Sequence, residues 1–380
     1  MRLAIAQTGA PTAVVNRSLD GFLSASVGND VVAILGGATG LLNDRVRAIT
    51  RADVSSSELQ RVGSWLGGGR FSVGENDLSA MVDTLVRHRV DGLAIIGGNG
   101  TMALLEAISK TASARGMALR CVGIPKTIDN DIVGVDHTPG FASAARYLAR
   151  TVTDLARDQS AMGNVEPVRI VETMGRSTGW LALAASYARH DPEFAADLVL
   201  IPETTFELPH FLARVEDIVE QRGRALVVVS EGVAPELTLQ PVHDTNHTRL
   251  IQGGISRVLA GEVRENLGFA ARGEVIGTLQ RSASTAISAV DAEEAKTVGA
   301  IAATWLTSGE HTDVMVGIEV ADSATAAPET YVASFTPISL GTVAGHVRAV
   351  PEMWRESDPQ QLSTFYDWLD PLIRTPLSHP

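Results

Sequence analysis

Short runs of mostly apolar residues alternate along the chain with segments in which apolar positions recur at helical spacing. This alternation predicts an α/β protein in which helices cover layered sheets. The predicted strands span residues 3–6, 31–35, 93–96, 118–124, 168–172, 198–201, 225–230 and 274–278. The predicted helices span residues 13–27, 77–88, 102–115, 142–157 and 177–188, and the acidic segment 358–372 is expected to form a surface helix.

Length and composition favour a compact globular protein with two lobes. The chain has 380 residues, of which 45% are hydrophobic, and this exceeds the usual size of one domain. No run approaches the roughly 18 apolar residues of a membrane span, and the N-terminus lacks a signal-peptide pattern. The single cysteine, Cys121, lies in an apolar run, so we expect a cytoplasmic protein without disulfides. A net charge of -13 disfavours nucleic-acid partners and requires that anions be bound by local features.

Glycine-bearing turns follow several predicted strands at the point where a helix begins. The turn at Gly9 is a weak signal for phosphate binding, because many α/β proteins use such a turn for packing alone. The turn Gly97-Gly98-Asn99-Gly100-Thr101 is stronger, since three glycines let the backbone approach a ligand closely. Kinases that act on NAD and on diacylglycerol carry a similar turn, so this motif alone does not select a family.

The segment 125–131, Pro-Lys-Thr-Ile-Asp-Asn-Asp, combines the groups that phosphoryl transfer requires. Asp129 and Asp131 supply a base for a substrate hydroxyl and a partner for magnesium, with a hydroxyl and an ammonium beside them on Thr127 and Lys126. Lysine is scarce elsewhere in the chain, which makes the position of Lys126 informative. A surface loop without chemistry is the alternative, but such loops rarely follow a buried strand.

These segments resemble the motifs of the phosphofructokinase family, and they occur in the family's order. The matching blocks are 7–16, 97–101, 125–131, 136–141, 174–176, 201–203, 230–232 and 280–281. Several are most similar to the bacterial branch that contains pyrophosphate-dependent enzymes. The resemblance implies a two-lobed phosphofructokinase-like α/β fold, in which each lobe is a mainly parallel sheet flanked by helices. It also implies a donor-binding lobe at residues 1–138 plus about 292–345, and a sugar-phosphate-binding lobe at 139–291 plus about 346–380.

The resemblance further implies roles for individual residues and a homodimer or homotetramer. Asp129 would be the base on the sugar 1-hydroxyl, and the other catalytic residues would be Thr127, Asp131, Lys126 and Arg176. The residues expected to bind the phosphoryl donor are Gly9, Ala10, Arg70, Gly97, Gly98, Asn99, Gly100 and Thr101. The residues expected to bind the sugar phosphate are Thr127, Asp129, Met174, Gly175, Arg176, Glu203 and Arg281. Asn99 and Asp131 would hold Mg²⁺.

Departures from the family pattern bear on the donor. Gly100 stands where pyrophosphate enzymes carry an aspartate, which would crowd and repel the α-phosphate of a nucleotide, so Gly100 favours ATP. Lys126, in contrast, is typical of the pyrophosphate branch. Asn99 replaces a carboxylate that would help to hold magnesium, and Ala10 replaces a glycine that faces the donor's terminal phosphate.

The acceptor side departs from the family as well. The arginine that ATP-type relatives carry downstream of Arg281 has no counterpart near Asp291-Ala292, which alters the contacts to the acceptor's phosphate. The leading expectation is magnesium-dependent transfer from ATP to the 1-hydroxyl of fructose 6-phosphate. One alternative has pyrophosphate as the donor. Others are a kinase or pyrophosphokinase for another ketohexose 6-phosphate, with diphosphoryl transfer and AMP release, and a noncatalytic sugar-phosphate-binding regulator.

Overall fold

The protein divides into two compact units. The structure, a computed structural model, describes residues 1–69, 73–162, 165–238, 240–243, 248–251, 253–320 and 331–375. Unit 1 comprises Met1–Ser143, Arg281–Arg348 and the segment that begins at Thr375, and unit 2 comprises Ala144–Gln280 and Ala349–Arg374. Each unit contains a mainly parallel sheet with helices packed on it, which confirms the predicted two-lobed α/β fold. The assignment of donor and sugar binding to separate lobes stays a prediction.

Unit 1 is built on a sheet whose strands, among the described residues, follow the order β13-β12-β5-β4-β1-β2-β3. Only the outer pairs β2–β3 and β12–β13 are antiparallel in this described sheet. The strands are β1 (Arg2–Gln7), β2 (Asp30–Ile34), β3 (Val46–Ala48), β4 (Gly92–Gly97), β5 (Arg120–Pro125), β12 (Val314–Val320) and β13 (Ala333–Ser339). The helices are α1 (Val15–Ala25), α2 (Gly37–Leu42), α3 (Ser56–Gln60), α4 (Glu75–Arg87), α5 (Asn99–Ala114), α10 (Ala289–Ser308) and α11 (Leu340–Val343).

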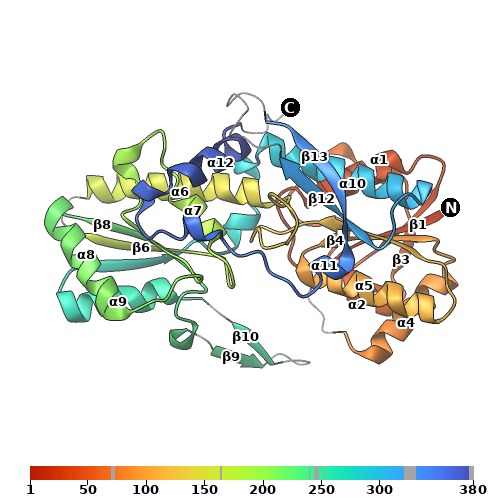
Figure 1. The fold of residues 1–380 in the computed structure, drawn as a ribbon, viewed down its shortest axis with the longest axis horizontal. Helices are drawn as coiled ribbons and strands as arrows, with labels where there is room; N and C mark the ends of the chain where they lie inside the picture. The colour runs from red at the N-terminus through yellow and green to blue at the C-terminus, as the bar shows by residue number, and fades with distance from the viewer. Residues whose placement is uncertain are drawn as a thin grey trace. The chain divides into compact units, whose positions relative to one another are not determined.

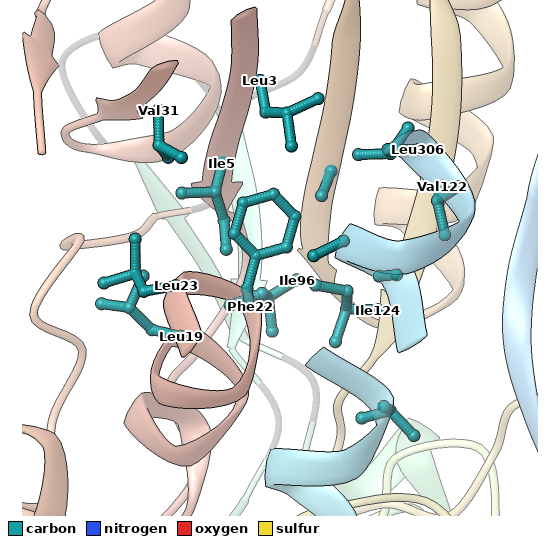
Figure 2. Packing of buried hydrophobic residues seen from close by; sticks show 14 of the residues in the cluster. Leu3, Ile5, Leu19, Phe22, Leu23, Val31, Ile96, Val122, Ile124 and Leu306 are labelled. Carbon is teal, nitrogen blue, oxygen red and sulfur yellow. The ribbon is translucent and has the colours of Figure 1, made fainter. Parts of the chain in front are cut away.

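Helices cover both faces of this sheet (Figure 1). Leu3 and Ile5 of β1 belong to a core cluster with Phe22 of α1 and Leu306 of α10 (Figure 2). The alternate position Ala4 belongs to a second cluster, which α4 and α5 complete on the opposite face. Strands buried on both faces need continuous apolar runs, and this explains why the sequence pattern located them.

The backbones of α1 and α10 approach each other closely, because glycines stand where the helices meet. A Cβ atom on Gly21 would lie 1.8 Å from the carbonyl oxygen of Lys296. A Cβ atom on Gly299 would lie 2.0 Å from the carbonyl oxygen of Ser18. Neither position has room for a side chain, so the two glycines determine how closely the helices pack.

Unit 2 contains a parallel sheet with the order β11-β6-β8-β7 and the hairpin β9–β10. The helices α8 and α9 bury one face of the parallel sheet. The strands are β6 (Val168–Thr173), β7 (Leu198–Leu200), β8 (Ala225–Ser230), β9 (Gln240–His243), β10 (Thr248–Ile251) and β11 (Ala271–Val275). The helices are α6 (Phe141–Ala161), which begins in unit 1, α7 (Trp180–Ala185), α8 (Leu208–Arg222), α9 (Ile255–Leu267) and α12 (Ser363–Ile373).

The structure corrects three sequence-based expectations. The strand predicted at 274–278 is β11, which ends at Val275, and a short 3₁₀ helix (Gly277–Arg281) follows it. The helix predicted at 177–188 is confined to α7. The expected surface helix at 358–372 is α12, which buries Phe365, Leu369 and Leu372. Its acidic residues had concealed an apolar face with helical spacing. In the described part of the chain, no helix is long and apolar enough to cross a membrane.

The substitution Gly299→Ala should lower the free energy of unfolding by about 2–3 kcal/mol, because the added methyl group overpacks the contact between α1 and α10. The midpoint of urea denaturation measures this change. Gly261→Ala in α9 is the matched control, since its Cβ would meet only Nη2 of Arg264, at 3.8 Å. The control should gain about 0.5–1 kcal/mol from helix propensity. A Gly299→Ala protein as stable as the wild type would contradict this account of the packing.

Candidate active site

The predicted donor and catalytic segments begin at one edge of the unit 1 sheet. β1, β4 and β5 are parallel neighbours, and each ends where one of these segments begins. The amide of Thr8 donates a hydrogen bond to the carbonyl of Ile96, and the amide of Lys126 donates one to the carbonyl of Gly97, both at 3.0 Å. The carboxyl edge of a parallel sheet is the usual location of ligand sites in such folds.

Lys126 connects the first glycine turn with the catalytic segment. Its side chain is 4% exposed, and Nζ donates to the carbonyls of Thr8 at 3.1 Å and Ala10 at 2.6 Å. Gly9 between them has a φ of 75°, a conformation that glycine adopts without strain. Because these two carbonyls occupy donor hydrogens of the ammonium, Lys126 orients the turn. Its predicted catalytic role stays a prediction.

The second glycine turn places the N-terminus of α5 at the same edge. Asn99 is the first residue of this helix, and Gly98 precedes it as the N-cap. A helix N-terminus presents free amides and positive potential, which favour anions. A Cβ atom added to Gly100 would meet no described atom within 4 Å, so the space in front of the first turn is open. Thr101 is fixed by a hydrogen bond of 2.5 Å between its hydroxyl and that of Thr8.

Asn99 and Asp131 form a pair that fits a magnesium ion. Nδ2 of Asn99 donates to the backbone carbonyl of Asp131 at 2.9 Å and to its Oδ2 at 3.1 Å. Oδ1 of Asn99 and Oδ1 of Asp131 are buried, and neither accepts a hydrogen bond from the described residues. Two such oxygen atoms suit a hard cation that takes its remaining ligands from water and phosphate. Among the described residues, no group of three His, Cys, Asp or Glu side chains offers a metal site.

The electrostatic environment of the Asp131 carboxylate also favours a cation at this pair. Burial and, to a smaller extent, the neighbouring negative charge of Asp129 together raise the pKa of Asp131 to about 6. A cation between the carboxylates and a phosphate would reverse both effects. The predicted ligands Asn99 and Asp131 therefore form a coherent site, although their metal binding stays a prediction.

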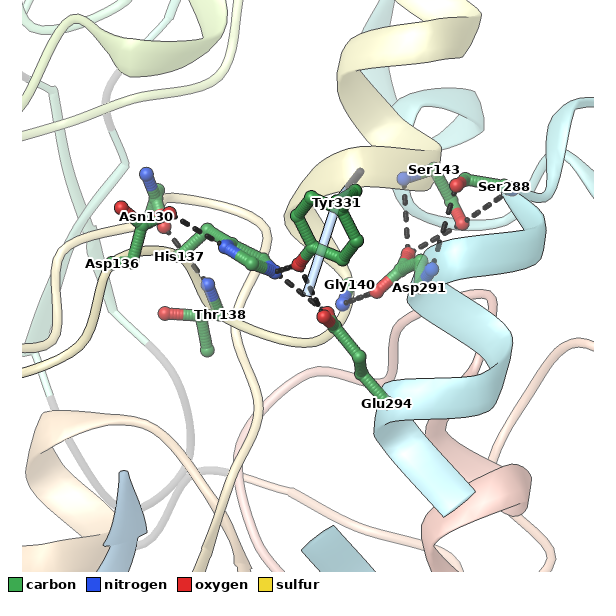
Figure 3. Close-up of polar contacts among 10 residues, drawn as sticks. All are labelled: Asn130, Asp136, His137, Thr138, Gly140, Ser143, Ser288, Asp291, Glu294 and Tyr331. Atoms are coloured by element: carbon green, nitrogen blue, oxygen red, sulfur yellow. Dashed lines mark hydrogen bonds and ion pairs between the residues drawn. The ribbon is translucent and has the colours of Figure 1, made fainter. Parts of the chain in front are cut away.

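The segment around Asp129 is held in place by polar contacts, of which Figure 3 shows the bond between Asn130 and Thr138. The amide of Asp129 donates to the hydroxyl of Thr127 at 3.1 Å. Asn130 has no exposed surface and a φ of 54°, and its Oδ1 accepts a hydrogen bond from the amide of Thr138 at 3.0 Å. The amide of Thr127 also donates to the carbonyl of Pro139, at 3.2 Å. These bonds lock the catalytic segment onto the loop that follows it.

That loop is in turn anchored to α10 through a buried cluster (Figure 3). His137 contacts Asp136 at 2.8 Å and Glu294 at 2.6 Å, and the hydroxyl of Tyr331 donates to Glu294. Burial alone would lower the pKa of His137, but the charge of Glu294 and hydrogen bonds to both carboxylates raise it to about 10. The imidazole is therefore protonated at neutral pH, and both ring nitrogens donate hydrogen bonds.

A second carboxylate of α10 supports the start of α6. Asp291 is fully buried and accepts hydrogen bonds from the amides of Gly140 at 2.7 Å and Ser143 at 2.9 Å. The hydroxyl of Ser143 donates to it at 2.5 Å. Burial raises the pKa of Asp291 to about 6, against the opposing effect of these hydrogen bonds. Ala292, next along the helix, lies in a small apolar cluster with Ile287 and Ala295.

The residues predicted to bind the sugar lie mainly in unit 2. Met174, Gly175 and Arg176 follow β6, and the amide of Met174 donates to Oε1 of Gln280 at 3.0 Å. Arg176 is exposed. The carboxylate of Glu203 accepts hydrogen bonds from the amide of Gly179, at 3.0 Å to the nearer oxygen, and from the amide of Val350, at 3.0 Å. These contacts give Glu203 a structural function beside its predicted one.

Two further predicted residues have a different status. Arg281 ends the 3₁₀ helix that follows β11 and belongs to unit 1. Arg70, the predicted contact to the donor phosphates, lies outside the described residues. The roles of both stay predictions.

The structure points to two residues to which no role had been given. β6 and β8 are paired with Thr173 opposite Ser230, so Glu231 lies beside the Met174 loop, and its amide donates to the Thr173 carbonyl at 2.9 Å. The sequence block 230–232 contains Glu231, so the sequence could have indicated this residue.

The amide of Arg348 donates to the carbonyl of Asp131 at 2.8 Å, and burial lowers the pKa of the Arg348 guanidinium to about 10. No motif surrounds Arg348, and only the fold brings it to the catalytic segment.

Comparisons with known proteins agree with this architecture. The family model described as Phosphofructokinase matches residues 2–306. A relative named sulfofructose kinase, from Alkalicoccus urumqiensis, is 37% identical over 379 residues, which cover 99% of this chain and 96% of the relative. A relative named pyrophosphate–fructose 6-phosphate 1-phosphotransferase, from Xanthomonas campestris pv. campestris, is 33% identical over 373 residues, covering 94% and 87%. The crystal structure of a pyrophosphate-dependent phosphofructokinase from Nitrosospira multiformis has a TM-score of 0.84 at 27% identity, covering 100% of this chain and 93% of that one.

The two parallel-sheet units and these matches define an α/β phosphotransferase. The chain belongs to the phosphofructokinase family. It is therefore an enzyme, and the family resemblance and reaction class predicted from the sequence are confirmed.

The substitution Asp131→Asn should raise the free energy of unfolding at neutral pH, without magnesium, by about 3 kcal/mol, given a shift of roughly two pKa units. The pKa of Asp131 is raised on folding, so its ionised form destabilises the folded state. The gain should be present above pH 6 and vanish below about pH 4, where the carboxyl is protonated in both states. Urea denaturation across this pH range measures it.

The matched control is Asp217→Asn, at an exposed position of α8, which should change stability by less than about 0.5 kcal/mol. Magnesium should stabilise the wild type more than the Asp131→Asn protein. A constant difference between wild type and variant from pH 4 to pH 8 would refute the proposed environment of Asp131.

Proposed function

We propose that the enzyme transfers the terminal phosphoryl group of ATP to the 1-hydroxyl of a fructose that carries an anionic group at C6. The observation that carries this proposal is the fixed segment of Thr127, Asp129 and Asp131 at the sheet edge where α5 begins. Asp129 accepts the proton of the hydroxyl as its oxygen attacks the terminal phosphorus. The bond from that phosphorus to the bridging oxygen breaks, and ADP leaves with the electron pair.

Asn99 and Asp131 would hold Mg²⁺, which supplies charge neutralisation on the donor phosphates when bound. The N-terminus of α5 offers its amides to the same phosphates. The exposed guanidinium of Arg176 is available to stabilise negative charge on the transferring group. Each of these residues acts by position and charge, as phosphoryl transfer requires.

ATP is supported as the donor by the open space at Gly100. An aspartate there would place a carboxylate beside the α-phosphate, whereas glycine admits a nucleotide. Pyrophosphate is the competing donor, since the relative from Xanthomonas campestris is named for it. Lys126, which is typical of the pyrophosphate branch, favours pyrophosphate, and two of the three donor hydrogens of its ammonium go to the turn carbonyls of Thr8 and Ala10.

We propose sulfofructose as the acceptor, with its sulfo group in place of the 6-phosphate. A relative named sulfofructose kinase matches almost the whole chain. A sulfonate carries one negative charge, whereas a phosphate monoester carries about 1.5 to 2 near neutral pH. One cationic contact fewer suits the smaller charge, since the arginine that ATP-type relatives carry downstream of Arg281 has no counterpart near Asp291-Ala292, and Ala292 lies in an apolar cluster. Fructose 6-phosphate remains the second candidate, in line with the relatives named for it.

A panel of two donors and two acceptors tests the proposal. ATP or pyrophosphate is combined with sulfofructose or fructose 6-phosphate in the presence of magnesium, and products are identified by mass spectrometry. We expect the highest kcat/KM with ATP and sulfofructose, a mass gain of one phosphoryl group, and a loss of at least about 10³-fold in Asp129→Ala. A gain of two phosphoryl groups with AMP release would show a pyrophosphokinase instead. Binding without turnover would show a regulator.

The substitution Gly100→Asp should shift donor preference from ATP towards pyrophosphate. The side chain fits without a clash, since no described atom lies within 4 Å of the added Cβ, so the fold should be retained. Repulsion of the α-phosphate should raise KM for ATP about tenfold or more, while KM for pyrophosphate should change less. Gly100→Ala is the control for bulk without charge. An unchanged ratio of the two donors would show that Gly100 does not select ATP.

A further inference from the structure

The loop 136–140 supports the catalytic segment through its backbone. The amide of Thr138 donates to Oδ1 of Asn130 at 3.0 Å, and the amide of Thr127 donates to a carbonyl of the same loop at 3.2 Å. A single parallel bridge also joins Thr127 to the end of the loop. These contacts lie on both sides of Asp129 in the sequence, so the position of this carboxylate follows the position of the loop.

Two buried carboxylates of α10 hold this loop (Figure 3). Oε2 of Glu294 lies 2.6 Å from Nε2 of His137, and Asp291 accepts a hydrogen bond from the amide of Gly140 at 2.7 Å. The two acids are three residues apart and therefore lie on the same face of the helix. Asp291 binds a backbone amide of the loop, which any residue except proline supplies. Glu294, in the described part of the chain, reaches the loop through the imidazole of His137.

The charge of His137 is balanced by groups from several elements. His137 has no exposed surface, and Glu294 is 5% exposed. Nδ1 of His137 lies 2.8 Å from Asp136 of the loop, and the hydroxyl of Tyr331, which precedes β13, donates to Glu294. The charge of Asp136 also acts on the guanidinium of Arg348. Two cations and two carboxylates thus form one buried network, in which loss of one charge leaves its partner uncompensated.

We propose that His137 and Glu294 are positioning residues for phosphoryl transfer, because their ion pair holds the loop that fixes Thr127 and Asp129. The proposal rests on the proposed function, in which Asp129 is the base. The pair is buried and acts through the loop rather than on a substrate. A base that is displaced loses rate without loss of substrate affinity, and a shift of about 1 Å costs up to about 100-fold. Removal of the pair therefore lowers kcat and leaves KM almost unchanged.

The charge of Glu294 keeps the imidazole in the form that donates from both nitrogens. Burial alone lowers the pKa of His137, whereas Glu294 and Asp136 raise it, so the ring of the wild type stays protonated at neutral pH. Asp291 adds a further negative charge beside Glu294. Without the charge of Glu294, burial has the greater weight and the pKa of His137 falls towards neutral pH. The loop is then held firmly only at acidic pH, where the ring takes up its proton.

Steady-state kinetics of the full chain from about pH 5.5 to 8.5 test this role, with the donor and acceptor that give the highest kcat/KM. One test variant is Glu294→Gln, which keeps the shape of the side chain and removes its charge. A double variant with His137→Gln in addition removes the titrating ring. The matched control is Tyr331→Phe, which removes a hydrogen bond to Glu294 and leaves the ion pair. Circular dichroism verifies that each protein is folded.

We expect kcat of Glu294→Gln to be about tenfold or more below that of the wild type near pH 8, with KM within about threefold. The ratio of the two kcat values should recover as the pH falls to about 6. In the double variant the ratio should stay low at every pH. Tyr331→Phe should keep the kcat and the pH profile of the wild type.

A Glu294→Gln enzyme with the kcat of the wild type, or with a loss of equal size at every pH, would overturn the proposal. An equal loss in Tyr331→Phe would do the same. If Glu294→Gln does not fold, the single variant His137→Gln takes its place, and a wild-type kcat in that variant would contradict the role of the pair. Failure of the proposed function is distinguishable, since it would appear as an inactive wild type or an active Asp129→Ala protein.

Discussion

The candidate active site depends on one buried hydrogen bond, from the amide of Thr138 to Oδ1 of Asn130. Asn130 stands between the two catalytic carboxylates in the left-handed region, which asparagine tolerates better than most residues. The bond holds this conformation, and so it determines where Asp129 and Asp131 lie. Thr138 is itself held by the anchoring of His137 to Glu294. The catalytic segment therefore depends on a helix that follows it by more than a hundred residues, and it folds only with unit 1 as a whole.

The arrangement gains function at the expense of stability. Asp131 is buried near the like charge of Asp129, and two oxygen atoms of the Asn99–Asp131 pair lack donors among the described residues. Asp291, in the same unit, is more deeply buried and its pKa is raised to a similar value, but backbone amides and a hydroxyl satisfy its oxygen atoms. The contrast separates a carboxylate that supports the fold from one prepared for a cation. Unsatisfied groups of this kind persist at functional sites because the surrounding structure fixes them.

The sequence alone predicted the central strands and the turns that follow them. Buried parallel strands are continuous apolar runs, and their carboxyl ends meet at one edge, so the motifs after β1, β4 and β5 could be brought together without coordinates. The contacts of side chains with distant backbone could not be anticipated. No local pattern shows that Lys126 bonds to the carbonyl of Ala10, or that Glu203 bonds to the amide of Val350. The buried face of α12 was not predicted, because the acidic composition of the segment suggested an exposed helix and the helical spacing of its apolar residues was given less weight.

The features that distinguish this chain within its family are mostly side chains that it lacks. Gly100 leaves space at the N-terminus of α5 that no described side chain fills, and no arginine stands near Asp291-Ala292, where Ala292 belongs to an apolar cluster. Removing a charged group changes specificity without new packing, because an open or apolar position requires no partner, whereas an added buried charge requires compensation.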